Sequence, residues 1–144
     1  MPYAALQDYL DAFGEDEMID LTNLHDPEAT TVNTANLLRN QEKATALIDG
    51  MIAGCPSVAA AMPFATAPAI LKAIELDLVR YYLDSLKPRD DVRARYEDAI
   101  KQLQLIGSCK MGLGLPASEV APSPGSPSYS SPAPVFSRDT LADF

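Results

Sequence analysis

Carboxylates are the most abundant ionisable side chains in the first part of the chain. Residues 1–38 contain no lysine or arginine but eight acids, which are Asp8, Asp11, Glu15, Asp16, Glu17, Asp20, Asp26 and Glu28. The runs at 15–17 and 90–91 fall where helices are expected to begin, and a helix dipole favours acids there without any metal. No group of acids has the spacing of a calcium-binding loop. This segment is consistent with a solvated face, or with a surface that repels DNA or meets a basic partner.

Other signatures of catalysis are absent from the sequence. His25 is the single histidine, and it lies in an expected loop without a nucleophile nearby in sequence. We find no phosphate-binding glycine loop and no HExxH or GxSxG pattern. The spacing of Cys55 and Cys109 excludes a CxxC redox or zinc motif; one disulfide is possible, but two reduced, half-buried thiols are favoured. We therefore expect a protein that is not an enzyme and that uses no cofactor or metal.

Length and charge limit the remaining classes. The chain has 144 residues, about one domain, and a formal net charge of −9. Since residues 39–144 are nearly neutral, the acidic excess lies in the first segment, and the chain is a poor candidate for gripping nucleic acid by its phosphates. No apolar run approaches the ~18 residues of a membrane span. The N-terminus lacks a secretory signal, so we expect a protein made and kept in the cytoplasm.

The element that must position these side chains is a helix expected at residues 68–86. Its apolar residues cover most of the circumference, and a helix that is apolar nearly all round is buried among neighbours. Its charges Asp77, Arg80 and Asp84 share a narrow strip at i, i+3 and i+7. We expect Arg80 to reach both acids, so that the strip closes on itself.

Further helices are expected on both sides of this centre. The hydrophobic spacing predicts a short helix at 4–13, a short acidic helical turn at 15–23, a helix capped by Asn33 or Thr34 that ends near residue 53, and a helix capped by Asp90. Gly50 is expected to mark a close approach by a neighbour. Residues 55–67 are predicted to be a loop that wraps over the core or contacts another subunit. The fold class is therefore all-α, a small bundle of about four helices.

The composition changes after Leu115. Residues 116–134 are rich in Pro, Ser and Ala and cannot bury enough surface to order themselves, so they are predicted to form a flexible tether. Residues 135–144 are apolar and charged again, which is typical of a docking peptide, although a frayed terminus is the alternative. We thus divide the chain into a helical domain at 1–115, a tether at 116–134 and a docking peptide at 135–144, which together give the bundle an extended C-terminal arm.

Four pieces of the sequence together resemble one known family. They are YAALQDYLDAFGEDEMIDLT, ATALIDGMIAG followed by a proline-containing loop and APAILKAIELDLVRYYL, RDDVRARYEDAIKQLQLIGSCKMGLGL, and the terminal PVFSRDTLADF. Their order and content are similar to the head–tail connector (adaptor) proteins of Mu-like tailed bacteriophages and prophages. The resemblance covers nearly the whole chain and does not depend on a catalytic motif.

This resemblance implies a structural virion protein, made in the host bacterial cytoplasm and located at the capsid vertex, in the neck. Its expected partners are the portal protein, neighbouring copies of itself in a ring of twelve, and a tail terminator or stopper protein. DNA would pass through the ring without specific binding, and no membrane is involved. The resemblance places the docking positions of the arm at Val135, Phe136, Ser137, Arg138, Leu141 and Phe144.

Two surfaces of such a ring can be suggested from the sequence. An acidic lumen would let DNA slide, and we assign the lumen or its rim to Asp8, Asp11, Glu15, Asp16, Glu17 and Asp20. The strip of Asp77, Arg80 and Asp84 is a possible subunit boundary. The alternative function is a small acidic cytoplasmic regulator that binds and masks a basic partner protein. A helical DNA-binding adaptor is a third reading, disfavoured by the charge balance.

Overall fold

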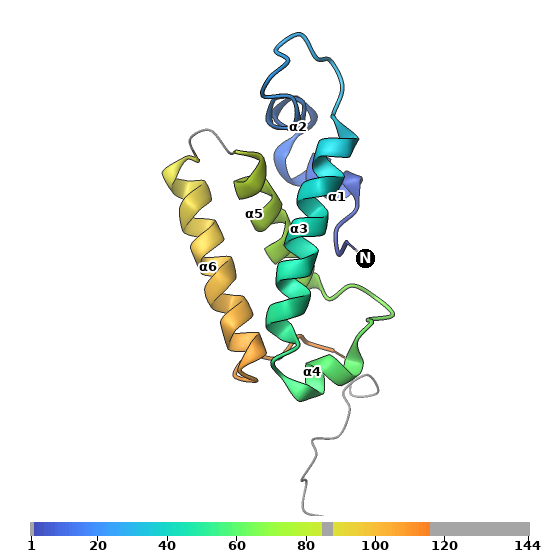
Figure 1. Cartoon of the computed structure of the whole chain (residues 1–144), viewed down its shortest axis with the longest axis vertical. Helices are drawn as coiled ribbons and strands as arrows, with labels where there is room; N and C mark the ends of the chain where they lie inside the picture. Colours follow the sequence, from blue (N-terminus) through green and yellow to red (C-terminus); the bar gives the residue numbers. More distant parts are fainter. Residues whose placement is uncertain (1, 85–87, 116–144) are drawn as a thin grey trace, which may run out of the picture.

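The computed structural model describes residues 2–84 and 88–115, and these form an all-α bundle, as predicted. Six helices follow one another in the described residues: α1 (Leu6–Phe13), α2 (Glu15–Thr22), α3 (Thr34–Ile52), α4 (Pro56–Ala61), α5 (Ala69–Leu83) and α6 (Asp90–Gly107). The long helices α3, α5 and α6 lie side by side, with α1 and α2 towards one end and α4 at the other (Figure 1). The expected arrangement of about four helices is thus three long helices with three short ones around their ends.

Helix α5 is the centre of the bundle, as its sequence predicts. It packs against α3, α6 and α2. Only Ala69 and Ala73 of its residues are exposed. The other faces bury its large apolar side chains, which are Leu71, Ile74, Leu78, Val79 and Leu83. A helix buried on several sides is stable because of this packing rather than because of its intrinsic helix propensity.

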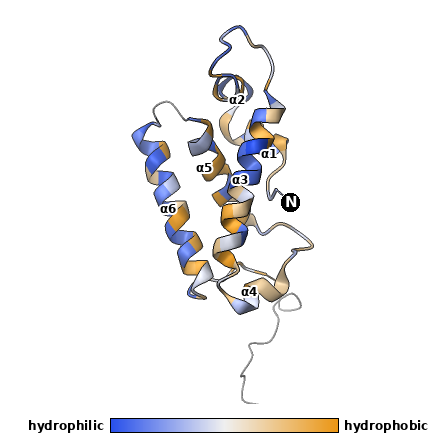
Figure 2. Ribbon diagram, viewed as in Figure 1, coloured by the Kyte–Doolittle hydropathy of each residue, from blue (hydrophilic) through white to orange (hydrophobic). Residues whose placement is uncertain are grey.

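The outer helices show the amphipathic pattern expected of a bundle. Hydrophilic residues follow the exposed side of α6, and apolar residues are grouped where the long helices face one another (Figure 2). Asn33 caps α3, since its side chain accepts a hydrogen bond from the backbone N–H of Asn36 at 3.1 Å. The expected cap at Asp90 is displaced by one residue: Arg89 holds the N-cap position and Asp90 begins α6.

The predicted loop at 55–67 is wrong over its first half. Residues Pro56–Ala61 form α4, with proline in the first turn. The fixed φ of Pro56 suits the first turn of a helix, and the alanines that follow favour helix. Val58 is buried, and Met62 and Phe64 pack against the core. The segment therefore wraps over the core, which was one of its two predicted roles.

Helices α3 and α6 approach each other closely near their C-terminal ends. A Cβ atom added to Gly107 would lie 2.3 Å from the carbonyl oxygen of Met51, and one added to Gly54 would lie 3.0 Å from the carbonyl oxygen of Gly107. The expected close approach at Gly50 is wrong, because nothing lies within 4 Å of a Cβ atom built there. The sequence pattern locates glycines, but only the packing shows which one a neighbour requires.

A disulfide joins Cys55 to Cys109 at this same end of the bundle, with a Cα–Cα distance of 5.2 Å. The sequence favoured two reduced thiols, and the structure corrects that preference. The two cysteines are 54 residues apart in sequence, but the close approach of α3 and α6 places them next to each other. The bond connects the start of α4 to the turn from which residues 110–115 leave α6.

We predict that Gly107→Ala destabilises the bundle by roughly 1–3 kcal/mol, because the new methyl group meets a backbone carbonyl that cannot move alone. The matched control is Gly50→Ala in α3, which has free space and should stabilise the protein by about 0.5–1 kcal/mol. Urea unfolding of both variants measures these changes. Equal effects of the two substitutions would contradict the close contact between α3 and α6.

Candidate protein-interaction surfaces

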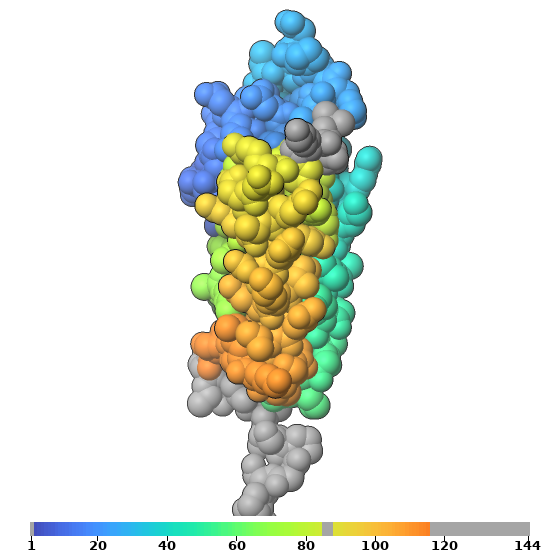
Figure 3. Space-filling view, turned by 90° about the vertical axis from the view of Figure 1, so that its left-hand side faces the viewer, coloured from blue at the N-terminus to red at the C-terminus, as the bar shows by residue number. Residues whose placement is uncertain are grey.

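The acidic segment folds into one end of the molecule. Gly14 has a φ of 87°, which allows a sharp turn between α1 and α2. The two helices and the loop that follows form a continuous cap above α6 and α3 (Figure 3). Four of the six acids predicted to line a lumen are exposed on this cap, namely Asp11, Glu15, Asp16 and Asp20. They leave a negative surface free for a partner or for repulsion.

Asp8 is not free in this way. Its carboxylate accepts a hydrogen bond from the backbone N–H of Ala5 at 2.7 Å and from Nζ of Lys72 at 2.9 Å. The Ala5 hydrogen bond is the main cause that lowers the pKa of Asp8, and the Lys72 hydrogen bond adds to it. Because Lys72 belongs to α5, this pair connects α1 to the central helix.

Glu17 is the second acid of this set that is held within the molecule. A single carboxylate oxygen, Oε1, accepts hydrogen bonds from Nη2 of Arg80 and Nη2 of Arg89, each at 2.6 Å. The side chain of Arg80 is only 12% exposed, and its guanidinium lies 4.6 Å from the centre of the Phe13 ring. Glu17 therefore ties α2 to α5 and to the segment that precedes α6.

The predicted closure of the Asp77–Arg80–Asp84 strip is wrong. Arg80 reaches across to Glu17 of another helix, and within the described residues it forms no salt bridge with either acid of its own helix. Half-buried Asp77 has a raised pKa because of desolvation, partly offset by Arg95 and Arg80. Asp84 is the C-cap of α5. The tertiary partner Glu17 replaces the local acids because it pairs with the guanidinium of Arg80, whose side chain is mostly buried.

Glu75 is the most unusual charged group of the domain, and the sequence interpretation missed it. It is fully buried in α5, where Oε2 accepts from the backbone N–H of Ala4 at 2.5 Å and Oε1 from the hydroxyl of Thr45 at 2.9 Å. Burial is the main cause that raises its pKa, while these hydrogen bonds lower it. The available signal was its position between Leu71 and Leu78 on the apolar arc, where a charged residue is rare.

Glu75 is part of a set of hydrogen bonds that hold the N-terminal residues on the core. Gln41 donates to the carbonyl oxygen of Ala4 at 3.1 Å, so both backbone groups of Ala4 are paired. The hydroxyl of Tyr3 donates to Asp49. Tyr3 and Ala4 are therefore fixed to α3 and α5 before α1 begins.

Residues 2–84 and 88–115 contain neither a metal-binding cluster nor a membrane-spanning helix. No group of three or more His, Cys, Asp or Glu side chains there is placed to hold a metal. None of its helices has both the length and the apolar character needed to cross a bilayer. His25 is exposed in the loop between α2 and α3. The predicted arm residues, which are Val135, Phe136, Ser137, Arg138, Leu141 and Phe144, lie outside the described residues.

Comparison with known proteins identifies the family. The sequence profile of a family described as "Bacteriophage Mu, Gp36" matches residues 3–131, most of the chain. The chain belongs to the bacteriophage Mu Gp36 family. One relative is described as "Mu-like prophage FluMu protein gp36" from Haemophilus influenzae, and it is 29% identical over 119 residues, which cover 82% of each chain. The Gp36 family match spans all six helices, so the resemblance to a Mu-like phage protein is confirmed.

We predict that Glu75 makes the stability of this Gp36 family member depend on pH. Because its pKa is raised in the folded state, the native protein binds a proton more tightly than the unfolded chain, so this group lowers stability as the pH rises above its ordinary value of 4.5. Glu75→Gln removes the charge, and Thr45 can accept from the new amide. Relative to wild type, the variant should gain stability at pH 7 and lose that gain near pH 4.

Chemical unfolding at several pH values measures this difference. The control is Glu75→Leu, which leaves the N–H of Ala4 and the hydroxyl of Thr45 without their partner and should be about 1–3 kcal/mol less stable than Glu75→Gln at every pH, since neither variant titrates at this position. A constant difference between wild type and Glu75→Gln across the pH range would contradict the buried, titrating carboxylate.

We also predict that Glu17→Gln destabilises the domain by roughly 1–3 kcal/mol, because the mostly buried Arg80 is left without its carboxylate partner. Glu15→Gln is the matched control, since Glu15 is exposed in the same first turn of α2 and forms no salt bridge within the described residues. That control should change stability by no more than about 0.5 kcal/mol. Thermal unfolding at low and high salt measures both, and indistinguishable variants would contradict the role of Glu17.

Proposed function

We propose that this protein is a structural, non-enzymatic component of a phage particle, a connector whose copies form a ring between the portal and the tail or the next connector ring. The observation that carries the proposal is the match of residues 3–131 to a family of Mu-like phage proteins. The head–tail connector role comes from the resemblance of the four sequence pieces described above. In this proposal the protein is located at the capsid vertex, and its partners are the portal protein, a tail terminator or stopper protein, and neighbouring copies in a ring of twelve.

The charge distribution supports passage of DNA through such a ring. The exposed acids of the α1–α2 cap, Asp11, Glu15, Asp16 and Asp20, would repel phosphates and keep DNA from binding tightly. Asp8 and Glu17 contribute less to this repulsion, because each is paired with a cation of the same chain. We therefore propose that the four exposed acids face the lumen or its rim.

The C-terminal arm is proposed to attach each copy to the portal. A single arm of ten residues would bind modestly, but several arms on one ring raise the effective concentration and produce tight attachment. The division of the chain at residue 115 and the docking residues 135–144 remain predictions. The strip of Asp77 and Asp84 on α5 remains a proposed subunit boundary, with Arg80 already engaged by Glu17.

The alternative function is a small acidic regulator that masks a basic partner. The exposed acids of the cap are compatible with it, since they require no ring. This alternative predicts a monomer that binds a basic protein through the α1–α2 cap and does not attach to a portal.

We predict that the full chain attaches to the portal protein of the same phage and forms a ring there, whereas a chain that ends at Leu115 stays helical but is not captured. Size-exclusion chromatography with electron microscopy measures attachment, and circular dichroism measures folding. The control keeps residues 135–144 but replaces residues 116–134 with a Gly/Ser linker of equal length, which should attach normally.

Two outcomes would contradict this proposal. Normal capture of the chain that ends at Leu115 would refute the docking role of the arm. A ring reconstruction with Asp11, Glu15, Asp16 and Asp20 on its outer wall would refute the acidic lumen.

A further inference from the structure

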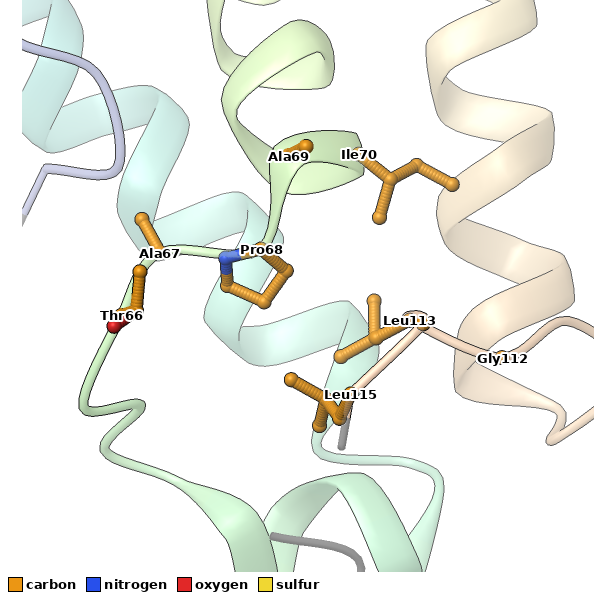
Figure 4. A pocket seen from close by; sticks show the side chains of 9 residues that line it. Thr66, Ala67, Pro68, Ala69, Ile70, Gly112, Leu113 and Leu115 are labelled. Atoms are coloured by element: carbon orange, nitrogen blue, oxygen red, sulfur yellow. The ribbon is translucent and has the colours of Figure 1, made fainter. Parts of the chain in front are cut away.

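An apolar groove runs along the segment that leads into α5. Its largest hollow, about 670 Å³, lies between the start of α5 and residues 112–115, and Ala67, Pro68, Ile70, Leu113 and Leu115 line it. Figure 4 shows that Pro68 and Ile70 from one side and Leu113 and Leu115 from the other border this space. Leu113 belongs to the bundle core and Ile70 and Leu115 pack against it, so the floor of the hollow is held by the core.

Two smaller hollows adjoin the first. One of about 260 Å³ is lined by Tyr3, Met62 and Phe64, among others. The other, of about 370 Å³, includes Pro2 and Lys72. Ala67 borders all three hollows, so they lie around one residue, and we call them together the Ala67 groove.

The charged residues that border the Ala67 groove are already paired. Lys72 forms its salt bridge with Asp8, and Asp49 accepts the hydrogen bond of Tyr3. The rest of the lining is mostly apolar or aromatic. Such a groove is suited to an apolar peptide rather than to an ion or a charged small molecule.

The chain itself supplies a peptide of this kind. Leu115 lies on the edge of the groove, and 29 residues follow it in the sequence. The apolar side chains of this stretch are concentrated near its end, at Val135, Phe136, Leu141 and Phe144. The segment between them and Leu115 is a 19-residue stretch of mainly Pro, Ser and Ala.

The length of this tether permits return to the same groove. As a flexible coil, 19 residues have a root-mean-square span of roughly 24 Å, and as a fully extended polyproline helix they span about 59 Å. The groove lies at the start of α5, a 15-residue helix about 22 Å long. A coiled tether and an extended tether are therefore both long enough to bring residues 135–144 back to it. A peptide tethered at the edge of its site has an effective concentration of order millimolar, which favours binding within one chain over exchange between chains at lower concentrations.

We propose that the Ala67 groove binds residues 135–144 of the same chain. In the free protein the groove then covers the apolar side chains of residues 135–144. A partner that binds these residues must first displace them from the groove. This inference does not depend on the connector role, because it concerns the isolated chain. If the arm also binds a portal, the groove keeps it from binding other proteins until the portal is present.

The test uses the full chain with the photoreactive amino acid p-benzoylphenylalanine in place of Thr66, an exposed residue at the groove. Illumination followed by mass spectrometry should give a cross-link to residues 135–144 within a monomer, with a yield that does not change on dilution. The matched control carries the same group at Glu97, an exposed position on α6, and should give no such cross-link.

A second variant tests the apolar contacts. Phe136→Ser combined with Phe144→Ser should reduce the cross-link from position 66 by about tenfold or more, because two buried aromatic side chains are lost. Circular dichroism should be unchanged. A cross-link to residues 135–144 of a second chain would overturn the proposal in favour of exchange between copies. No cross-link to residues 135–144 would overturn it outright.

Discussion

Helix α5 has to be covered on more than one side, and most of the structure follows from that requirement. Leu71, Ile74, Leu78, Val79 and Leu83 are buried on faces that no single neighbour could cover. Helices α3 and α6 cover two of these faces and α2 contributes to a third. Because the core is built around one helix, elements distant in sequence are brought together at its two ends.

The N-terminal segment is held to this core by polar contacts as well as by apolar packing. Glu75 and Gln41 pair both backbone groups of Ala4, Lys72 pairs with Asp8, and Arg80 pairs with Glu17. The hydrogen bonds to Glu75 offset part of the cost of burying its carboxylate, and the remaining cost appears as a raised pKa. The acidic cap is therefore a docked part of the domain, and only some of its charge is available to a partner.

The two ends of the molecule differ in chemistry. The α1–α2 cap presents Asp11, Glu15, Asp16 and Asp20 to solvent. Towards the other end, α4, the disulfide and the segment before α5 surround a mainly apolar region from which the chain leaves at Leu115 (Figure 1). A charged surface repels phosphates and adjusts partner choice, whereas an apolar groove provides binding free energy. The charged and the apolar surfaces of this small domain are therefore separate from each other.

The sequence by itself determined the fold class, the central position of α5 and the main helices, because these depend on the spacing of apolar residues along one chain. The sequence also carries the resemblance to a Mu-like phage family along most of its length. Tertiary structure decided the rest. It places Gly107 rather than Gly50 against a neighbouring helix, and it brings Cys55 and Cys109 into a disulfide. It also pairs Arg80 with Glu17 and buries the carboxylate of Glu75. Each of these depends on which residues distant in sequence become neighbours, and periodicity along a single helix does not contain that information.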